Sequence, residues 1–147
     1  MVLPYILNRQ IDVIDEEVYI PDDYYEYAYD FENNELLTRD GKHYYVYGNE
    51  ALKIWIYKAV RSDRFRYSAY SSRFGTEIFS LIGEVISEKL KKEEIKRYII
   101  ETVMVNPYIQ SIEKIELKSK KSVMIADVYI TSKFDNEVVN VECDIPI

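Results

Sequence analysis

Carboxylates are the most abundant side chains of this chain that could do acid–base chemistry: 26 of its 147 residues are Asp or Glu. A retaining glycosidase needs two carboxyl groups about 5–5.5 Å apart, one of them a general acid in an apolar setting. Glu77 and Glu84 are spaced to share a helix face, and Glu93, Glu94 and Glu101 lie among lysines. Acids in such runs are typical of solvated helix faces. No pair stands out, so no catalytic residue is predicted.

A single histidine and a single cysteine limit the remaining chemistry. His43 lies in a tyrosine-rich stretch without a nucleophile motif, and Cys143 falls on the apolar face of an expected strand. One cysteine excludes an internal disulfide framework and a cysteine-based zinc site, and one histidine argues against a His-rich metal site or a triad. Neither glycine-rich phosphate motif, GxGxxG or GxxxxGK[ST], occurs. We therefore expect no cofactor and no metal.

The charge is concentrated at one end. Residues 1–45 contain eleven acids and three bases, a balance of −8, whereas the rest of the chain carries +1. Phosphate binding needs a basic surface, so nucleic acid is not an expected partner.

No run approaches the ~20 apolar residues that span a bilayer, and residues 1–7 lack the pattern of a secretion signal. We expect no membrane contact and a soluble protein made in a reducing cytoplasm.

Tyrosine is unusually frequent near the start, with nine of the fifteen tyrosines before residue 48. A tyrosine offers a large apolar face and a polar tip, which suits partly wet contact surfaces. Residues 1–40 are therefore interpreted as an extended acidic arm that orders against its own domain or a neighbouring chain; a poorly ordered tail is the alternative. Residues 41–147 are long enough for one domain. Asp40-Gly41 predicts the turn of a hairpin over residues 36–47.

Three helices are expected to follow this arm. The first covers residues 50–62, with Asn49 as its cap. The second starts at Thr76 and buries Ile78, Phe79, Leu81, Ile82 and Val85. The third covers residues 92–105 and ends at Asn106-Pro107, because the residue before a proline disfavours the helical region.

After Pro107 the hydrophobic period changes to two, which predicts strands over residues 109–117, 122–131 and 137–145. The middle strand is apolar on both faces and is therefore expected to be central. In the last strand Val139, Val141 and Cys143 share one face. The predicted fold is α+β: three helices followed by a three-stranded antiparallel meander, with an extended acidic N-terminal arm.

The connection over residues 63–75 interleaves arginines with aromatic residues. Such a pattern can bind nucleic acid by stacking and phosphate contact, but the net acidity argues against it here. Arginine and tyrosine also dominate protein–protein hot spots. Pairing with acidic groups of the arm or of a partner is the preferred hypothesis, and a solvated connection is the alternative. The candidate partner-binding residues here are Arg64, Arg66, Tyr67, Tyr70 and Arg73.

Three further motifs occur in a characteristic order. They are Glu50-Ala51-Leu52 with Ile56-Tyr57, then Asp63-Arg64-Phe65 with Tyr67 and Tyr70, then Phe74-Gly75 with Glu77 and Leu81-Ile82-Gly83. With them, residues 41–145 resemble the baseplate wedge or sheath-initiator proteins of contractile phage tails. The likeness is to the XkdS-like type of defective prophages in Gram-positive bacteria. The wider family, which includes the T-even phage wedge subunit, has an EPR tripeptide where this chain has Asn106-Pro107-Tyr108.

The resemblance implies a structural role. Family members surround the tail tube in six copies, join wedge proteins and start the sheath, whose subunits add strands to a neighbour's sheet. The implied partners are the sheath protein, other wedge proteins and the tail tube or hub. The implied location is the host bacterial cytoplasm during assembly and then the baseplate of a phage, a tail-like bacteriocin or a related injection device. A lysozyme-like peptidoglycan hydrolase of the tail is the alternative, because family members have carried that label.

Two further candidate contact regions follow from this comparison. The first is the last strand, represented by Val139, Val141 and Cys143, because strand addition needs an accessible sheet edge. The second is the corner Asn106-Pro107-Tyr108, which occupies the place of the family tripeptide.

Overall fold

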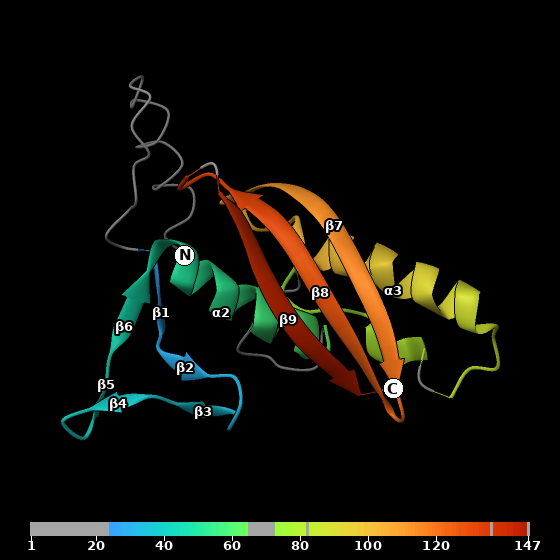
Figure 1. Cartoon of the computed structure of the whole chain (residues 1–147), viewed down its shortest axis with the longest axis horizontal. Coiled ribbons are helices and arrows are strands. Elements are labelled where there is room, and N and C mark those ends of the chain that lie inside the picture. The colour runs from blue at the N-terminus through green and yellow to red at the C-terminus, as the bar shows by residue number, and fades with distance from the viewer. Residues whose placement is uncertain (1–23, 65–72, 82, 136, 147) are drawn as a thin grey trace.

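The computed structural model describes residues 24–64, 73–81, 83–135 and 137–146, which contain two α-helices and nine strands (Figure 1). The helices are α2 (Gly48–Arg61) and α3 (Glu88–Val103), and a short 3-10 helix, η1 (Ile78–Leu81), precedes α3. Six strands are short: β1 (Tyr25–Tyr27), β2 (Tyr29–Asp30), β3 (Glu35–Leu36), β4 (Thr38–Arg39), β5 (Lys42–His43) and β6 (Tyr45–Tyr47). Three are long: β7 (Ile109–Lys120), β8 (Val123–Ser132) and β9 (Val138–Pro146).

The three long strands form one antiparallel sheet in the order β7–β8–β9. The pairing of β8 with β9 has no register shift from Val138 to Pro146. The pairing of β7 with β8 is shifted twice, once after Ile109 and once after Ile112. Each shift leaves a residue unpaired and increases the local twist. The sheet therefore has one regular edge strand, β9, and one bulged edge strand, β7.

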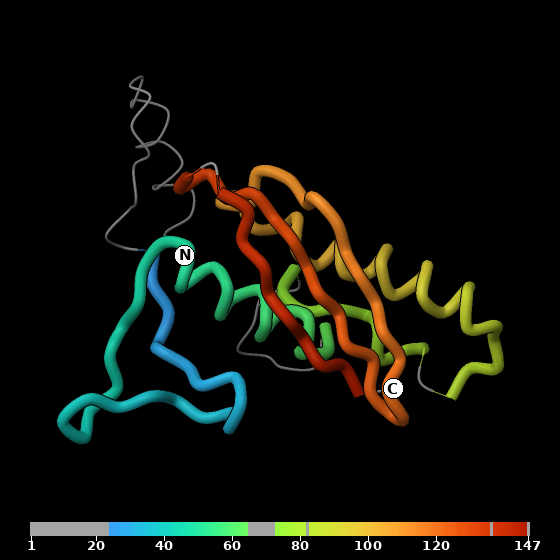
Figure 2. Tube along the Cα trace, in the orientation of Figure 1, coloured from blue at the N-terminus to red at the C-terminus, as the bar shows by residue number. Residues whose placement is uncertain are grey.

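The core lies between this sheet and the two helices. In the chain trace, α2 lies behind β9 and α3 lies on the β7 side (Figure 2). Residues four apart share a helix face, so each helix presents one apolar stripe to the sheet. Burying each aliphatic side chain contributes about 1.5–3 kcal/mol relative to leaving it exposed. The fully buried residues of these stripes are Leu52, Ile56 and Val60 of α2 and Ile95, Ile99 and Val103 of α3.

Residues 24–47, called the flap below, contain the six short strands and contact α2 through β1 and β6. Figure 1 shows the flap on the opposite side of α2 from α3. Lys58 Nζ donates to Glu26 Oε2 at 2.6 Å. Asn34 Oδ1 accepts hydrogen bonds from Tyr57 Oη at 2.7 Å and from Arg61 Nη1 at 2.9 Å. Polar side chains of α2 thus hold the flap at two points.

The predicted fold of three helices, a three-stranded meander and an extended arm is wrong. From Thr76 onward the chain forms only η1 instead of a second α-helix, and Val85, expected in its buried face, is fully exposed. The backbone of Thr76 is used elsewhere, because its N–H donates to Ser62 O at 2.8 Å and its C=O accepts from Arg64 N at 2.9 Å. Gly75 next to it has φ +98°. A helix cannot include such a backbone, so a single turn forms after it.

The expectation of an extended arm also fails for the residues that the structure describes. β1 pairs with β6, β2 with β3 and β4 with β5, all antiparallel. Asp40 and Gly41 both have positive φ, 53° and 77°, as a two-residue hairpin turn requires. This turn joins β4 to β5, and the expected boundary between arm and domain falls within it. The sequence shows the turn but not the pairing of β1 with β6 around it.

Neither helix of the described residues combines the length and the apolar character that crossing a membrane requires.

Candidate partner-binding surfaces

The outer edge of β9 is a regular strand edge that the described residues leave unpaired. β9 pairs with β8 on one side, and none of the described strands pairs with it on the other. Such an edge offers a row of backbone N–H and C=O groups to a strand of another chain. The residues that alternate with its buried positions are all exposed. The edge therefore has the geometry that strand addition needs.

Val139, Val141 and Cys143, predicted as contact residues of this strand, point into the core. Their exposed fractions are 5%, 3% and 0%. Burial raises the pKa of the Cys143 thiol to about 12, so the group stays protonated and inert. In the folded protein these residues can offer a partner only their backbone groups. Their side chains hold the strand in place against α2.

The opposite edge of the sheet is less suited to pairing. The two irregularities of β7 interrupt its ladder near Ile109 and Ile112. Lysines on β7, among them Lys114, Lys118 and Lys120, add charge along that strand. Bulges and lysines are the features by which proteins prevent unwanted pairing at sheet edges. The β9 edge of the sheet is therefore better suited to strand addition than the β7 edge.

The corner Asn106-Pro107-Tyr108 is largely an internal junction. Asn106 is 4% exposed and Tyr108 is fully buried, whereas Pro107 is half-buried. The Tyr108 ring stacks on Phe134 with centroids 4.9 Å apart and lies 4.3 Å from the ring of Tyr24. Burial raises the pKa of the Tyr24 hydroxyl above its usual value. The corner thus joins the end of α3 to the first described residue of the flap.

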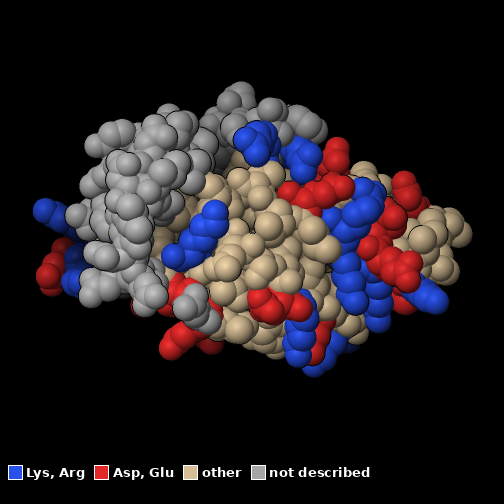
Figure 3. Space-filling model, turned by 90° about the horizontal axis from the view of Figure 1, so that it is seen from above, with Lys and Arg blue, Asp and Glu red and all other residues tan. Residues whose placement is uncertain are grey.

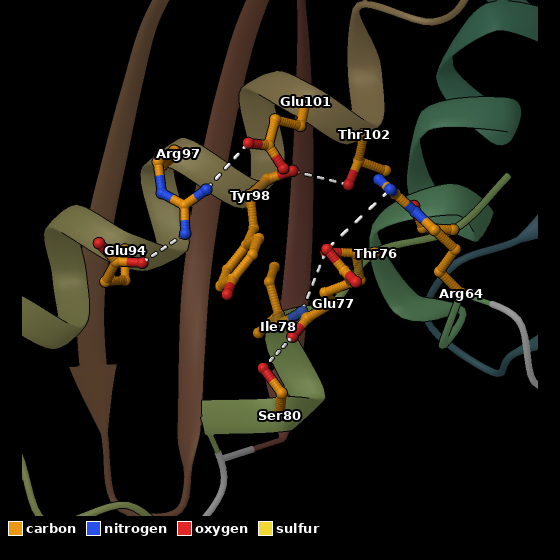
Figure 4. Close-up of polar contacts among 11 residues, drawn as sticks. Arg64, Thr76, Glu77, Ile78, Ser80, Glu94, Arg97, Tyr98, Glu101 and Thr102 are labelled. Atoms are coloured by element: carbon orange, nitrogen blue, oxygen red, sulfur yellow. Dashed lines mark hydrogen bonds and ion pairs between the residues drawn. The ribbon is translucent and has the colours of Figure 1, made fainter. Parts of the chain in front are cut away.

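The arginine-rich connection is described only at its two ends. Arg66, Tyr67 and Tyr70 lie outside the described residues. Arg64 Nη1 lies 4.0 Å from Glu77 Oε2, and its Nε donates to Gly75 O at 3.4 Å (Figure 4). One acidic neighbour of Arg64 is therefore Glu77, which lies just after the connection. Arg73 is exposed.

The predicted site residues that the structure describes are not gathered at one place. The corner and the end of β8 are close, because Lys133, the residue after β8, donates its N–H to Tyr108 O at 2.8 Å. Asn49, at the start of α2, bonds to Asp135 in the same region at 2.7 Å. Arg64 follows the other end of α2. The described site residues therefore lie on separate surfaces.

Two of the carboxylates considered above, Glu94 and Glu101, form solvated ion pairs. Arg97 bonds to Glu94 at 2.6 Å and to Glu101 at 2.9 Å, and all three side chains are substantially exposed (Figure 4). Acidic and basic side chains intermingle on the face seen in Figure 3. Hydrogen bonds lower the pKa of Asp30, Glu113 and Glu116, the opposite of what a general acid requires. Within the described ranges, no three His, Cys, Asp or Glu side chains are arranged to hold a metal ion.

Sequence reasoning missed Tyr24 and Phe134, which complete the aromatic cluster of the corner. Tyr24 contacts Tyr108 across more than 80 positions of sequence, and no local pattern signals such a pairing. Sequence reasoning also gave no role to Trp55. Its ring packs edge-on against Phe74, with centroids 5.9 Å apart. Both contacts join residues that are far apart in the sequence and become neighbours only in the folded chain.

The comparison with known proteins identifies the family. Residues 25–137 match the family described as contractile injection system sheath initiator. The phage-like element PBSX protein XkdS of Bacillus subtilis (strain 168) is 30% identical over 99 residues, which cover 64% of this chain and 64% of that relative. The match thus spans less than two thirds of the relative's length. The chain belongs to the sheath initiator family of contractile injection systems, and the resemblance predicted from its motifs is confirmed.

Proposed function

We propose that this chain is a structural subunit of a contractile tail baseplate and that a sheath subunit adds a strand to the outer edge of β9. In this proposal six copies surround the tail tube or hub, join the wedge proteins and start the sheath. They assemble in the cytoplasm of the producing bacterium before entering the particle. The observation that carries the proposal is the regular edge from Val138 to Pro146, which the described strands leave unpaired.

Two features support β9 over β7 as the docking edge: β9 has no bulge, and its alternate side chains are fixed in the core. Its exposed side chains include Glu142 and Asp144. A strand held rigidly from one face loses little conformational freedom when a second strand pairs with it. The acidic outer face discourages pairing between copies of this chain, because like charges would meet. The backbone stays available to a different strand.

The wedge contacts are assigned to the arginine-rich connection and the corner. Arg64, Arg66, Tyr67, Tyr70 and Arg73 are the proposed contact residues of the connection. Arg73 is exposed, and arginine is well suited to contacts with acidic protein surfaces. At the corner, Pro107 is the most accessible residue, and Asn106 and Tyr108 support it from inside.

A pair of proline variants tests the docking edge. The N–H groups of neighbouring residues in a strand point to opposite sides. One of the two variants Val141→Pro and Glu142→Pro therefore removes an N–H that points away from β8 and leaves the hydrogen bonds to β8 intact. Circular dichroism identifies the variant that still folds. In cells carrying the complete tail gene cluster, this variant should give baseplates without sheath by electron microscopy.

The matched control uses the other edge of the sheet. Glu116→Pro and Leu117→Pro form the same kind of pair on β7, and the member that folds should support full-length sheaths. Full-length sheaths on the folded β9 variant would show that β9 is not the docking edge. Loss of the whole baseplate would assign β9 to wedge contacts instead. If neither β9 variant folds, a photo-crosslinking residue at Asn140 should link this chain to the sheath protein, and its failure to do so contradicts the proposal.

A further inference from the structure

Five aromatic rings form a continuous row along the flap. Tyr25 lies opposite Tyr47 and Tyr27 lies opposite Tyr45 in the β1–β6 pair. Successive ring centroids are 6.4 Å apart from Tyr47 to Tyr25, 4.4 Å to Tyr45, 4.6 Å to Tyr27 and 6.1 Å to His43. Aromatic rings attract one another over about this range of distances. These five residues are called the tyrosine row below.

The tyrosine row lies on the face of the ribbon that points away from α2. Side chains alternate between the two faces of a strand. The residues between the tyrosines, Glu26 and Val46, therefore occupy the opposite face, where Glu26 pairs with Lys58 of α2 and Val46 packs against the core. The four tyrosines are 43–49% exposed. The flap is thus fixed from behind and presents phenol rings at its front.

The rings are ordered before any partner arrives. Each tyrosine packs against another, and the hydroxyls of Tyr27 and Tyr45 are 3.1 Å apart in a hydrogen bond. Association with such a surface costs less side-chain entropy than association with freely rotating side chains. Exposed, preordered tyrosines are characteristic of protein contact surfaces.

The charge of the flap indicates the chemistry of the partner. Residues 24–47 contain five acids and two bases. This balance repels phosphate groups and attracts cations. Arginine stacks on tyrosine faces more readily than lysine does. The described part of the chain contains this contact three times: Arg39 lies 4.2 Å from the centre of the Tyr44 ring, Arg61 4.8 Å from that of Tyr57 and Arg97 4.5 Å from that of Tyr98.

We propose that the tyrosine row is a second docking surface of this chain and that it binds an arginine-bearing surface of a different protein in the same particle. The row lies on the flap, whereas the β9 edge belongs to the three-stranded sheet on the other side of α2 (Figure 1). The two surfaces are independent. The assignment rests on the proposed place of this chain in a tail particle, and it stands whether or not a sheath strand adds to β9.

A double substitution tests whether the rings are needed. Tyr25→Thr with Tyr47→Thr removes two rings and keeps residues that favour strands. The variant should fold, as judged by circular dichroism and thermal unfolding, and its copy number in purified particles should fall at least about tenfold. The matched control, Tyr25→Phe with Tyr47→Phe, keeps the rings and should stay within about twofold of the wild type. Normal incorporation of the folded threonine variant would overturn the proposal.

Photo-crosslinking tests the chemistry of the partner and needs only one substitution. A crosslinking residue at Tyr45 in the full chain, followed by mass spectrometry of assembled particles, should map the contact to an arginine-containing segment of another protein. Replacing that arginine by alanine should reduce the crosslink at least about fivefold. A crosslink to nucleic acid, to a second copy of this chain or to a segment without arginine contradicts the proposal. The absence of any crosslink from Tyr45, in particles that contain the labelled chain at its normal copy number, also contradicts the proposal.

Discussion

Asn106 Nδ2 donates a hydrogen bond to Tyr24 Oη at 3.0 Å, and this contact joins two residues 82 positions apart. The other end of the same amide, Oδ1, accepts from the backbone N–H of Tyr108 at 2.9 Å. One buried side chain therefore fixes both the exit of α3 and the first described residue of the flap. It does so at the position where the wider family is expected to carry its charged tripeptide.

Replacing Asn106 by alanine should destabilise the protein by about 1–3 kcal/mol, because two buried groups lose their partner. The change should appear as a lower midpoint of urea unfolding. Asn140→Ala, at an exposed position of β9, is the control and should change the free energy of unfolding by less than about 0.5 kcal/mol. Equal effects of the two substitutions would show that the corner does not depend on this amide.

Two glycines with positive φ should respond differently to alanine. At Gly75, φ is +98° and an added Cβ would lie 2.7 Å from the backbone oxygen of Ser62; at Gly83, φ is +84° and nothing lies within 4 Å. Gly75→Ala should therefore cost about 2–4 kcal/mol, since steric overlap adds to backbone strain. Gly83→Ala should cost about 1–2 kcal/mol from strain alone. Thermal unfolding of the two variants measures the difference, and a smaller loss at Gly75 would contradict the close approach of its backbone to Ser62.

The stability of the protein should fall in alkaline solution, partly through Cys143. Burial raises the pKa of its thiol from 9 to about 12, so between these values the unfolded chain loses a proton that the folded chain keeps. This contribution is complete below pH 9 and is lost as the pH rises towards 12. Cys143→Ala should be less stable at pH 7.5 by about 1 kcal/mol. Its free energy of unfolding should fall less than that of the wild type between pH 8.5 and 10.5, and parallel curves from urea titrations would exclude this effect.

Ser87 caps α3, since its side chain accepts a hydrogen bond from Leu90 N at 3.2 Å. Ser87→Ala should cost about 0.5–2 kcal/mol, whereas Ser87→Asp keeps an acceptor and should remain within about 0.5 kcal/mol of the wild type. Chemical denaturation followed by circular dichroism separates the two variants. Identical losses would mean that the cap does not contribute to stability.

Local pattern predicted the first and last helices but not their limits. The periodic apolar residues of 50–62 correspond to α2 (Gly48–Arg61). The helix expected over 92–105 begins four residues earlier, because Ser87 caps it and the polar residues that follow continue the helix on its exposed side. The second expected helix failed at Gly75, whose role depends on Ser62, thirteen residues away. Hydrophobic periodicity reflects the spacing of nearby residues, so it does not indicate a contact over thirteen positions.

The alternation in the last strand correctly placed Val139, Val141 and Cys143 on one face, and the structure shows that this face is buried. It did not reveal which edge of the sheet is regular, because bulges arise from the pairing of two strands and not from either one alone. The tyrosine row was equally hidden. Tyr25 and Tyr47 become neighbours only when the intervening residues of the flap fold back on themselves.

The bulged β7 and the regular β9 have a consequence for stoichiometry. A sheet with two open edges can join two incoming strands and can link its neighbours into a branched network. A sheet with one open edge can join only one incoming strand. If β9 is the only edge that accepts a strand, each copy can start a single chain of contacts and in one direction only. The number of copies in the baseplate would then set how many sheath strands can begin there.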